Sequence, residues 1–192
     1  MAATGQDKIK TGFGPMLEGF HYVPFNDPDA MSACEVDDVA AVMLEVVQGE
    51  GGVNPATPAF LEAVQAFCKK HEALLIVDEI QTGIGRTGTA FAYEETCLDP
   101  DIISSAKGLG SGFPVGAVIG KKKALGDAFS PGSHGTTFGG NMLAMAAVNA
   151  TLDVIFKEEF LSEVKEKGDY LLEKLQNVKQ LNIKKKKCGE KD

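Results

Sequence analysis

The fold is decided by residues 73–78, ALLIVD, in which five apolar residues lead directly to a carboxylate. A short apolar run of this kind is typical of a strand that is buried on both faces of a parallel sheet. A second run, VAAVMLEVV, occupies residues 39–47 and is followed by Gly49. Between the two, Thr57 and Pro58 predict a helix start, because apolar residues follow them at helical spacing. This order of strand, helix and strand predicts an α/β layer architecture.

Further segments extend the same pattern on the C-terminal side. We expect two more strands, at residues 101–105 and 115–119, and two long helices, at residues 141–158 and 160–177. The N-terminal side differs, because residues 11–34 are rich in Gly, Pro, Asn and Asp and predict an irregular arm. The chain is therefore expected to form a mainly parallel sheet flanked by helices.

Composition excludes several classes of protein. With 192 residues, 44% of them hydrophobic, the chain can bury a core. A net charge of -8 argues against a nucleic-acid partner, which requires clustered Lys and Arg. The four cysteines are widely spaced without a C-x-x-C pair, which argues against a metal site and favours a reducing cytosol. Neither a leader with an apolar core nor an apolar run of about 20 residues is visible, so we expect a cytoplasmic protein without membrane partners.

Asp78 is the first candidate for chemistry, because ligands in such sheets bind beyond the carboxyl ends of the strands. A carboxylate at the end of a buried strand must be hydrogen-bonded or paired with a cation. Two interpretations remain open. Asp78 either caps a helix or joins a structural ion pair, or it holds a cationic ring nitrogen of a ligand.

Lys107 is the second candidate, because it follows the predicted strand at residues 101–105 and precedes Gly108, Gly110 and Gly112. Glycines let the backbone bend and let a bulky ligand approach. A lysine held there and partly desolvated has a lowered pKa and a nucleophilic amine. The alternative interpretation is an exposed lysine in an ordinary loop.

The third candidate is the stretch SHGTTFGGN at residues 133–141, which leads into a predicted helix. Backbone N–H groups and hydroxyls at a helix start form an anion site, although a Gly-rich turn with a Thr cap is the alternative. Its spacing fits neither a Walker A loop nor a dinucleotide-binding fingerprint. Together, a carboxylate for a pyridinium, a lysine for an aldehyde and hydroxyls for a phosphate form the set that pyridoxal phosphate requires.

Four strings in the chain resemble the class III aminotransferases, and within that family the acetylornithine aminotransferase group. The resemblance covers roughly residues 10–178 and implies part of the large domain of a fold-type I transferase that depends on pyridoxal 5'-phosphate. The strings are EVVQGEGGV (45–53), LLIVDEIQTGIGRTG (74–88), SSAKGLGSGFPVGA (104–117) and HGTTFGGN (134–141).

The resemblance implies roles around the cofactor. Lys107 would bind the cofactor aldehyde covalently and later move a proton as general base and acid. Asp78 would pair with the protonated ring nitrogen, Ile80 would pack on one ring face, and Gln81 would hydrogen-bond the ring hydroxyl. Glu79 belongs to the same cofactor-binding motif, where we expect it to act through packing or a hydrogen-bond network.

The resemblance also implies that the site is shared between two subunits of a homodimer. Thr137 matches a threonine that binds the cofactor phosphate of the neighbouring subunit, and Thr136 matches a position near bound substrate. Glu50 matches a glutamate that positions a substrate-binding arginine. Glu45 would not touch the substrate or the cofactor but would hold the residues that do.

The implied reaction moves the terminal amino group of N-acetylornithine to the cofactor and then to 2-oxoglutarate, in arginine biosynthesis. Alternatives within the family are enzymes that act on ornithine, 4-aminobutyrate or succinyldiaminopimelate. The remaining alternative is an inactive fragment that keeps only the fold.

The resemblance predicts three parts in the chain. Residues 1–35 would be an irregular arm and entry segment, residues 36–158 an incomplete cofactor-binding core, and residues 159–192 a helix and truncated tail leading towards a C-terminal domain. Family members are about twice as long, so we expect the 192-residue chain on its own to be poorly stable and to have little or no activity.

Overall fold

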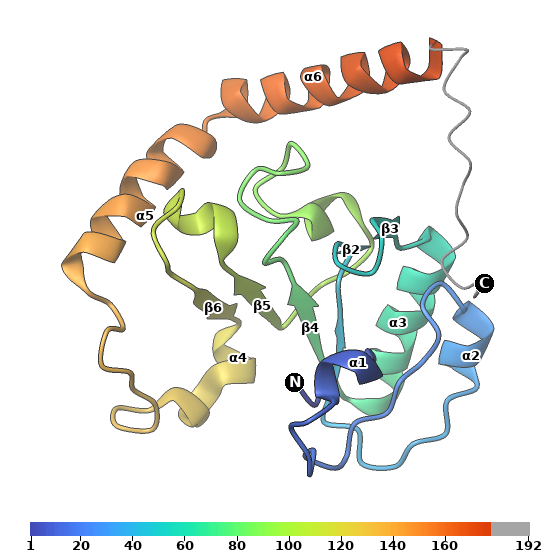
Figure 1. Cartoon of the computed structure of the whole chain (residues 1–192). Coiled ribbons are helices and arrows are strands. Elements are labelled where there is room, and N and C mark those ends of the chain that lie inside the picture. The colour runs from blue at the N-terminus through green and yellow to red at the C-terminus, as the bar shows by residue number, and fades with distance from the viewer. Residues whose placement is uncertain (178–192) are drawn as a thin grey trace.

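A four-stranded sheet lies at the centre of the computed structural model, which describes residues 1–177 (Figure 1). The strand order is β1-β4-β5-β6, in which β1, β4 and β5 run parallel and β6 runs antiparallel to β5. The predicted α/β architecture with a mainly parallel sheet is confirmed. The strands are β1 (Ala41–Leu44), β4 (Leu74–Asp78), β5 (Ile102–Ser105) and β6 (Ala117–Gly120).

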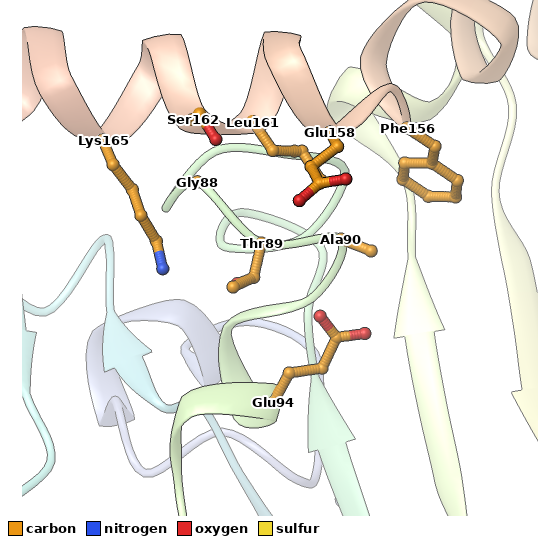
Figure 2. A pocket seen from close by; sticks show the side chains of 9 residues that line it. All are labelled: Gly88, Thr89, Ala90, Glu94, Phe156, Glu158, Leu161, Ser162 and Lys165. Atoms are coloured by element: carbon orange, nitrogen blue, oxygen red, sulfur yellow. The ribbon is translucent and has the colours of Figure 1, made fainter.

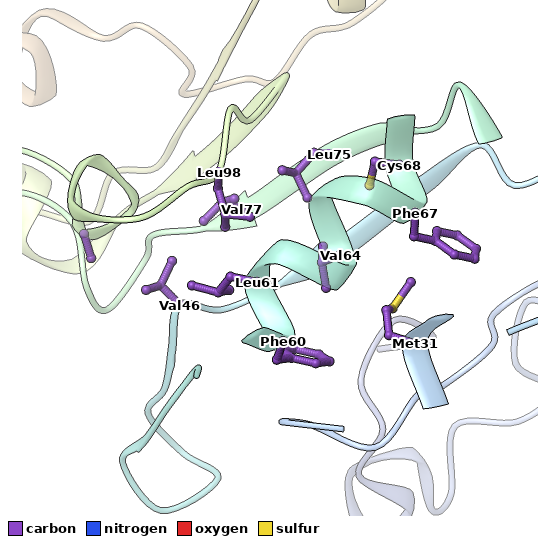
Figure 3. Close-up of a cluster of buried hydrophobic side chains, with 11 residues drawn as sticks. Met31, Val46, Phe60, Leu61, Val64, Phe67, Cys68, Leu75, Val77 and Leu98 are labelled. Atoms are coloured by element: carbon purple, nitrogen blue, oxygen red, sulfur yellow. The ribbon is translucent and has the colours of Figure 1, made fainter. Parts of the chain in front are cut away.

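Helix α3 (Pro58–His71) covers one face of the sheet and forms the core with it (Figure 3). The predicted start is confirmed, because the Thr57 hydroxyl accepts a hydrogen bond of 3.4 Å from the Phe60 N–H. Leu75 and Val77 of β4 are almost fully buried against its apolar side. The buried core cluster consists of Met31, Val46, Phe60, Leu61, Val64, Phe67, Cys68, Leu75, Val77, Ala92 and Leu98.

The predicted strand at residues 39–47 is shorter than expected. β1 ends at Leu44, and the chain then turns into a two-stranded antiparallel hairpin of β2 (Val47–Gln48) and β3 (Asn54–Pro55). The Glu45 carboxylate accepts a hydrogen bond of 3.1 Å from the Gly49 N–H. This contact ends the strand, because it draws the backbone into the hairpin instead of along the sheet.

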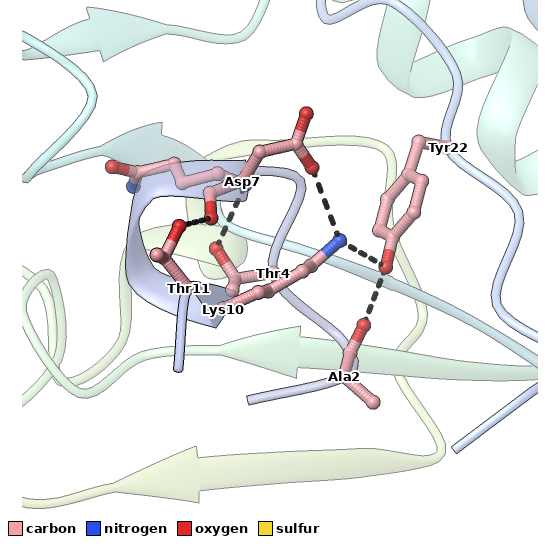
Figure 4. A network of polar contacts seen from close by, with 7 residues as sticks. Ala2, Thr4, Asp7, Lys10, Thr11 and Tyr22 are labelled. Atoms are coloured by element: carbon pink, nitrogen blue, oxygen red, sulfur yellow. Dashed lines mark hydrogen bonds and ion pairs between the residues drawn. The ribbon is translucent and has the colours of Figure 1, made fainter. Parts of the chain in front are cut away.

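The N-terminal arm is largely irregular and contains two short helices, α1 (Asp7–Lys10) and α2 (Pro28–Ser32). Polar contacts tie its first residues together (Figure 4): Lys10 donates to the Tyr22 hydroxyl at 2.8 Å, which in turn donates to the Ala2 carbonyl. Helix α2 packs against α3, so the arm is attached to the core.

The second face of the sheet is open within the described residues. Met43 in β1 and Val118 in β6 point to this face, and they are 50% and 57% exposed. The later helices lie beside the sheet, with α5 against the short 3-10 helix η2 and with α6 against α5. The remaining elements are η1 (Ala92–Glu95), η2 (Lys107–Gly110), α4 (Lys122–Leu125), η3 (Gly126–Phe129), α5 (Met142–Ile155) and α6 (Glu158–Asn177).

The three described cysteines, Cys34, Cys68 and Cys97, are free thiols. Burial in the core raises the pKa of Cys68 to about 11, so this thiol stays protonated at neutral pH.

Residues 1–177 contain no cluster of metal-ligating side chains. No helix in this part of the chain has the length and apolar character to cross a bilayer. The predicted tail from residue 178 onwards lies outside the described residues.

Replacing Leu61 with Ala tests the α3–sheet core. Leu61 is 4% exposed, and the cavity left by its side chain should cost about 2–5 kcal/mol of stability. The neighbouring Glu62→Ala variant is the matched control, because Glu62 is exposed on the same helix and its loss should cost less than about 0.5 kcal/mol. Thermal unfolding of the full-length polypeptide that contains this chain measures both variants, and equal midpoints for the two would contradict the packing described above.

Candidate active site

Two polar residues singled out in the sequence lie at the same edge of the sheet. Asp78 ends β4, and Lys107 follows the last residue of β5 by two positions. The two strands are parallel neighbours, and Asp78 stands opposite Ser104 in their register. Because parallel strands end at one edge, the loops after them emerge on the side where ligands bind in α/β sheets.

The loops after β4 and β5 also contact each other. Ile84, in the first loop, is buried, and its Cβ lies 3.5 Å from the place where a Cβ on Gly108 would stand. Ile84 and Lys107 have φ angles of 55° and 46°, a left-handed conformation that costs a non-glycine residue roughly 1–3 kcal/mol. Such backbone strain is concentrated at functional sites. Sequence reasoning missed Ile84, because no residue pattern predicts a left-handed β-branched residue.

Asp78 is half-buried, and local contacts hold one of its two carboxylate oxygens. Oδ1 accepts hydrogen bonds of 3.0 Å from both the Ile80 N–H and the Ser104 hydroxyl. Within residues 1–177, no hydrogen bond reaches Oδ2, and Asp78 takes part in no ion pair. The structural ion pair that was one alternative for Asp78 is therefore absent from residues 1–177. Oδ2 is left available for a cationic group.

Glu79 is fully buried and its side chain is satisfied by the protein itself. Its carboxylate accepts hydrogen bonds from the Thr82 hydroxyl and, at 2.8 Å, from the Tyr93 N–H. Its backbone N–H donates to the Ser104 carbonyl at 3.0 Å. These contacts fix the start of the loop after β4, which is the network role expected for Glu79. A direct contact of Glu79 with a cofactor stays a prediction.

The next two motif residues lie nearer the surface. Ile80 is half-buried and Gln81 is exposed. The amide of Gln81 lies against the backbone of Gly49, in the β2–β3 hairpin. Glu50 is exposed on the same hairpin, and Glu45 is half-buried behind it. The hairpin therefore joins the edge of the sheet that carries Asp78 and Lys107.

Lys107 begins η2 and its side chain is exposed. The chain itself therefore does not supply the desolvation that was expected for this amine.

Ser105, which sequence reasoning also missed, is 2% exposed, and its hydroxyl has no hydrogen-bond partner among the described residues. An unpaired buried hydroxyl is costly. Ser105 alternates with Ser104, so its side chain lies on the α3 side of the sheet, opposite to the face of Asp78.

The structure does not join the third candidate to the other two. Thr136 and Thr137 are exposed, in a segment that runs from η3 to α5 along the flank of the sheet (Figure 1). No hydrogen bond connects either threonine with Asp78 or Lys107 in the part of the chain that the structure describes. The alternative prediction, that a threonine of this segment caps the following helix, is wrong. Asn141 caps α5, because its side chain accepts a hydrogen bond of 2.9 Å from the Ala144 N–H.

A cavity of about 360 Å³ lies elsewhere, between the loop after β4 and helix α6 (Figure 2). None of the sequence-predicted site residues lines it. Its walls are formed by Gly88, Thr89, Ala90, Glu94, Phe156, Glu158, Leu161, Ser162 and Lys165.

Two glycines beside this cavity allow the helices to approach the loop. A Cβ on Gly85 would lie 2.5 Å from a methyl carbon of Ile155, and a Cβ on Gly88 would overlap the side chain of Lys165. Lys165 also forms an ion pair with Glu95. The end of α5 and the first turns of α6 are thus seated directly on the loop that begins at Asp78.

Variants of Glu79 test whether its role is structural. Glu79→Ala removes both acceptors from a fully buried position and leaves the Tyr93 N–H unpaired, which should cost about 2–4 kcal/mol of stability. Glu79→Gln keeps an acceptor for that N–H and should cost much less. Thermal unfolding of the full-length polypeptide that contains this chain compares the two variants, and an equal loss of stability in both would show that the negative charge is what matters.

Comparisons with known proteins agree with this arrangement. The family model of Aminotransferase class-III matches residues 1–187. An acetylornithine aminotransferase of Bacillus subtilis is 72% identical over 177 residues, which make up 92% of this chain and 46% of that protein. The protein of the same name from Halalkalibacterium halodurans is 62% identical over 90% of this chain and 44% of its own length. The chain thus spans about half the length of the curated relatives it matches.

Solved structures give the same result for the fold. The ornithine aminotransferase of Toxoplasma gondii superposes with a TM-score of 0.84 at 36% identity, over 91% of this chain and 42% of that one. The N-acetylornithine aminotransferase of Stenotrophomonas maltophilia superposes with a TM-score of 0.70 at 40% identity, over 83% of this chain and 42% of that one. The parallel strands, the edge with Asp78 and Lys107 and these matches together lead to one conclusion: the chain belongs to the class III aminotransferases.

Proposed function

We propose that this chain is part of the cofactor-binding domain of an aminotransferase that uses pyridoxal 5'-phosphate and takes N-acetylornithine as amino donor. The observation that carries the proposal is the common edge of β4 and β5, from which Asp78 and Lys107 both emerge. When bound, pyridoxal phosphate supplies an aldehyde carbon and an electron-withdrawing ring. A carboxylate and an amine on neighbouring loops are the two groups that such a ring needs from the protein.

Asp78 would hold the protonated ring nitrogen through Oδ2. The carboxylate is oriented for this task, because Ser104 and the Ile80 N–H both bind its other oxygen. A negative charge opposite the ring nitrogen keeps that nitrogen protonated, which strengthens the electron-withdrawing character of the ring. The absence of a competing ion pair among residues 1–177 supports this role.

Lys107 would be the point of covalent attachment. Its amine would hold the cofactor through the aldehyde carbon, and it would also move a proton at the substrate carbon as base and then acid. The left-handed backbone of Lys107 and its position at the sheet edge shared with Asp78 support this assignment.

The neighbouring residues would complete the binding site. Gln81 would donate a hydrogen bond to the ring oxygen, and Ile80 would pack on one ring face. Glu79 would fix the loop that carries both residues, as its buried hydrogen bonds indicate. Glu50 would act on the substrate side, because it lies on the hairpin that Gln81 contacts.

Thr137 would bind the phosphate of a cofactor held by a second subunit, and Thr136 would lie near its substrate. This proposal implies a homodimer. Its support is the exposure of the whole segment at residues 131–140, together with large apolar side chains that lie open beside it. Phe138, Met142 and Leu143 are 78%, 89% and 73% exposed.

The names of the relatives favour N-acetylornithine as donor. The resemblance of the motifs, and not these names, is the support for 2-oxoglutarate as acceptor and for a cytoplasmic role in arginine biosynthesis. Ornithine is the second candidate donor, because an ornithine aminotransferase gives the TM-score of 0.84. Neither 4-aminobutyrate nor succinyldiaminopimelate is named by the relatives described above.

Borohydride reduction tests the proposed attachment in the full-length polypeptide that contains this chain. Reduction after addition of pyridoxal phosphate should label Lys107, and Lys107→Ala should lower turnover by roughly 100- to 10,000-fold or more. Lys121→Ala is the control, because Lys121 pairs with Asp99 and lies outside the proposed site. A label on a different lysine would defeat the assignment, and a panel of amino donors would then decide between N-acetylornithine and ornithine.

We also propose that the 192-residue chain alone is poorly stable and has little or no activity. The open apolar sheet face at Met43 and Val118 supports this, because strands of a parallel sheet normally need a layer on both faces. Thermal unfolding and turnover should be measured on the chain by itself. A sharp unfolding transition together with normal turnover would refute the proposal.

A further inference from the structure

Gly49 and Gln81 come from different loops and meet at the edge of the sheet. A Cβ on Gly49 would overlap the Oε1 and Cδ atoms of Gln81 and would lie 3.0 Å from its Nε2 atom. The amide of Gln81 therefore occupies the space that any side chain at position 49 would need. The whole amide group of Gln81 therefore lies within 3.0 Å of that position.

The backbones on both sides of this contact are held in place. On one side, the Glu45 carboxylate accepts a hydrogen bond of 3.1 Å from the Gly49 N–H. Strand β2, which ends directly before Gly49, pairs with β3. On the other side, Glu79 anchors the loop through its buried carboxylate and through its N–H, which donates to Ser104. The part free to move is thus the flexible amide of Gln81, which is exposed.

We propose that Gly49 is a positioning residue for Gln81: its missing side chain leaves the space in which the amide rests against the hairpin. The inference rests on the proposed function, in which Nε2 donates to the ring oxygen of the cofactor.

This role differs from the usual reason why a position requires glycine, which is a left-handed φ angle. Gly49 has no left-handed φ angle, so an alanine there is not strained by its backbone. The atoms that would have to yield are the end of a flexible and exposed side chain, which can turn into solvent at little cost. Gly49→Ala should therefore displace the amide of Gln81 and leave the stability of the fold nearly unchanged.

Gly51→Ala provides a matched control in the same hairpin. Gly51 also lacks a left-handed φ angle, and a Cβ there would meet only the side chain of Gln48, at 3.2 Å or more. In the full-length polypeptide that contains this chain, Gly49→Ala should weaken the affinity for pyridoxal phosphate by roughly three- to tenfold, as expected for one lost hydrogen bond. It should also shift the absorption band of the bound cofactor. Gly51→Ala should change neither, and both variants should unfold near the temperature of the parent.

A double-mutant cycle with Gln81→Ala decides whether the effect passes through Gln81. Once the amide is gone, Gly49→Ala should have no further effect on cofactor affinity. An added loss in the double variant, or an equal loss in Gly51→Ala, would overturn the inference. So would a crystal structure of cofactor-free Gly49→Ala in which the amide of Gln81 has not moved.

These outcomes separate the inference from the proposed function. If borohydride labels Lys107 but the effects of Gly49→Ala and Gln81→Ala are additive, the inference fails and the aminotransferase remains. If Lys107 is never labelled, the proposed function fails, whereas the displaced amide in the cofactor-free crystal would still establish the contact between the hairpin and the loop.

Discussion

The parallel pairing of β4 with β5 is the constraint on which the site depends. It places Asp78 opposite Ser104, so that the Ser104 hydroxyl orients the carboxylate while its carbonyl receives the Glu79 N–H. One residue of β5 thereby fixes both the end of β4 and the start of the loop that follows. A shift of the register by one residue would turn Asp78 to the opposite face of the sheet and would separate it from the Lys107 turn.

The elements that could be predicted from the sequence are those whose signals are local. Thr57 followed by Pro58 fixes the start of α3, and apolar runs that end at Asp78 and Ser105 give β4 and β5. The hairpin after Leu44 was not predicted, because it depends on the Glu45 contact with Gly49, and side-chain contacts of this kind do not alter the apolar pattern. The sequence-predicted strand at residues 39–47 therefore runs three residues too far.

The site could be predicted only in part for a related reason. The positions of Asp78 and Lys107 follow from a general rule about strand ends, whereas the left-handed backbone of Ile84 and the unpaired buried hydroxyl of Ser105 have no signal in the residue spacing. The segment at residues 133–141 has suitable residue types for an anion site, but no hydrogen bond links its threonines with Asp78 or Lys107 in the described part of the chain. A site completed by a second subunit has no signature in the contacts of a single chain, and its role therefore stays a proposal.

Helix α6 and the loop after β4 are mechanically linked by the absence of two side chains. Gly85 and Gly88 let Ile155 and Lys165 rest on the backbone of the loop, with Glu95 holding the lysine from the other side. Both glycines also have positive φ angles, 77° and 90°. A side chain at either position would therefore be strained by its backbone and would have to push the two helices away from the loop.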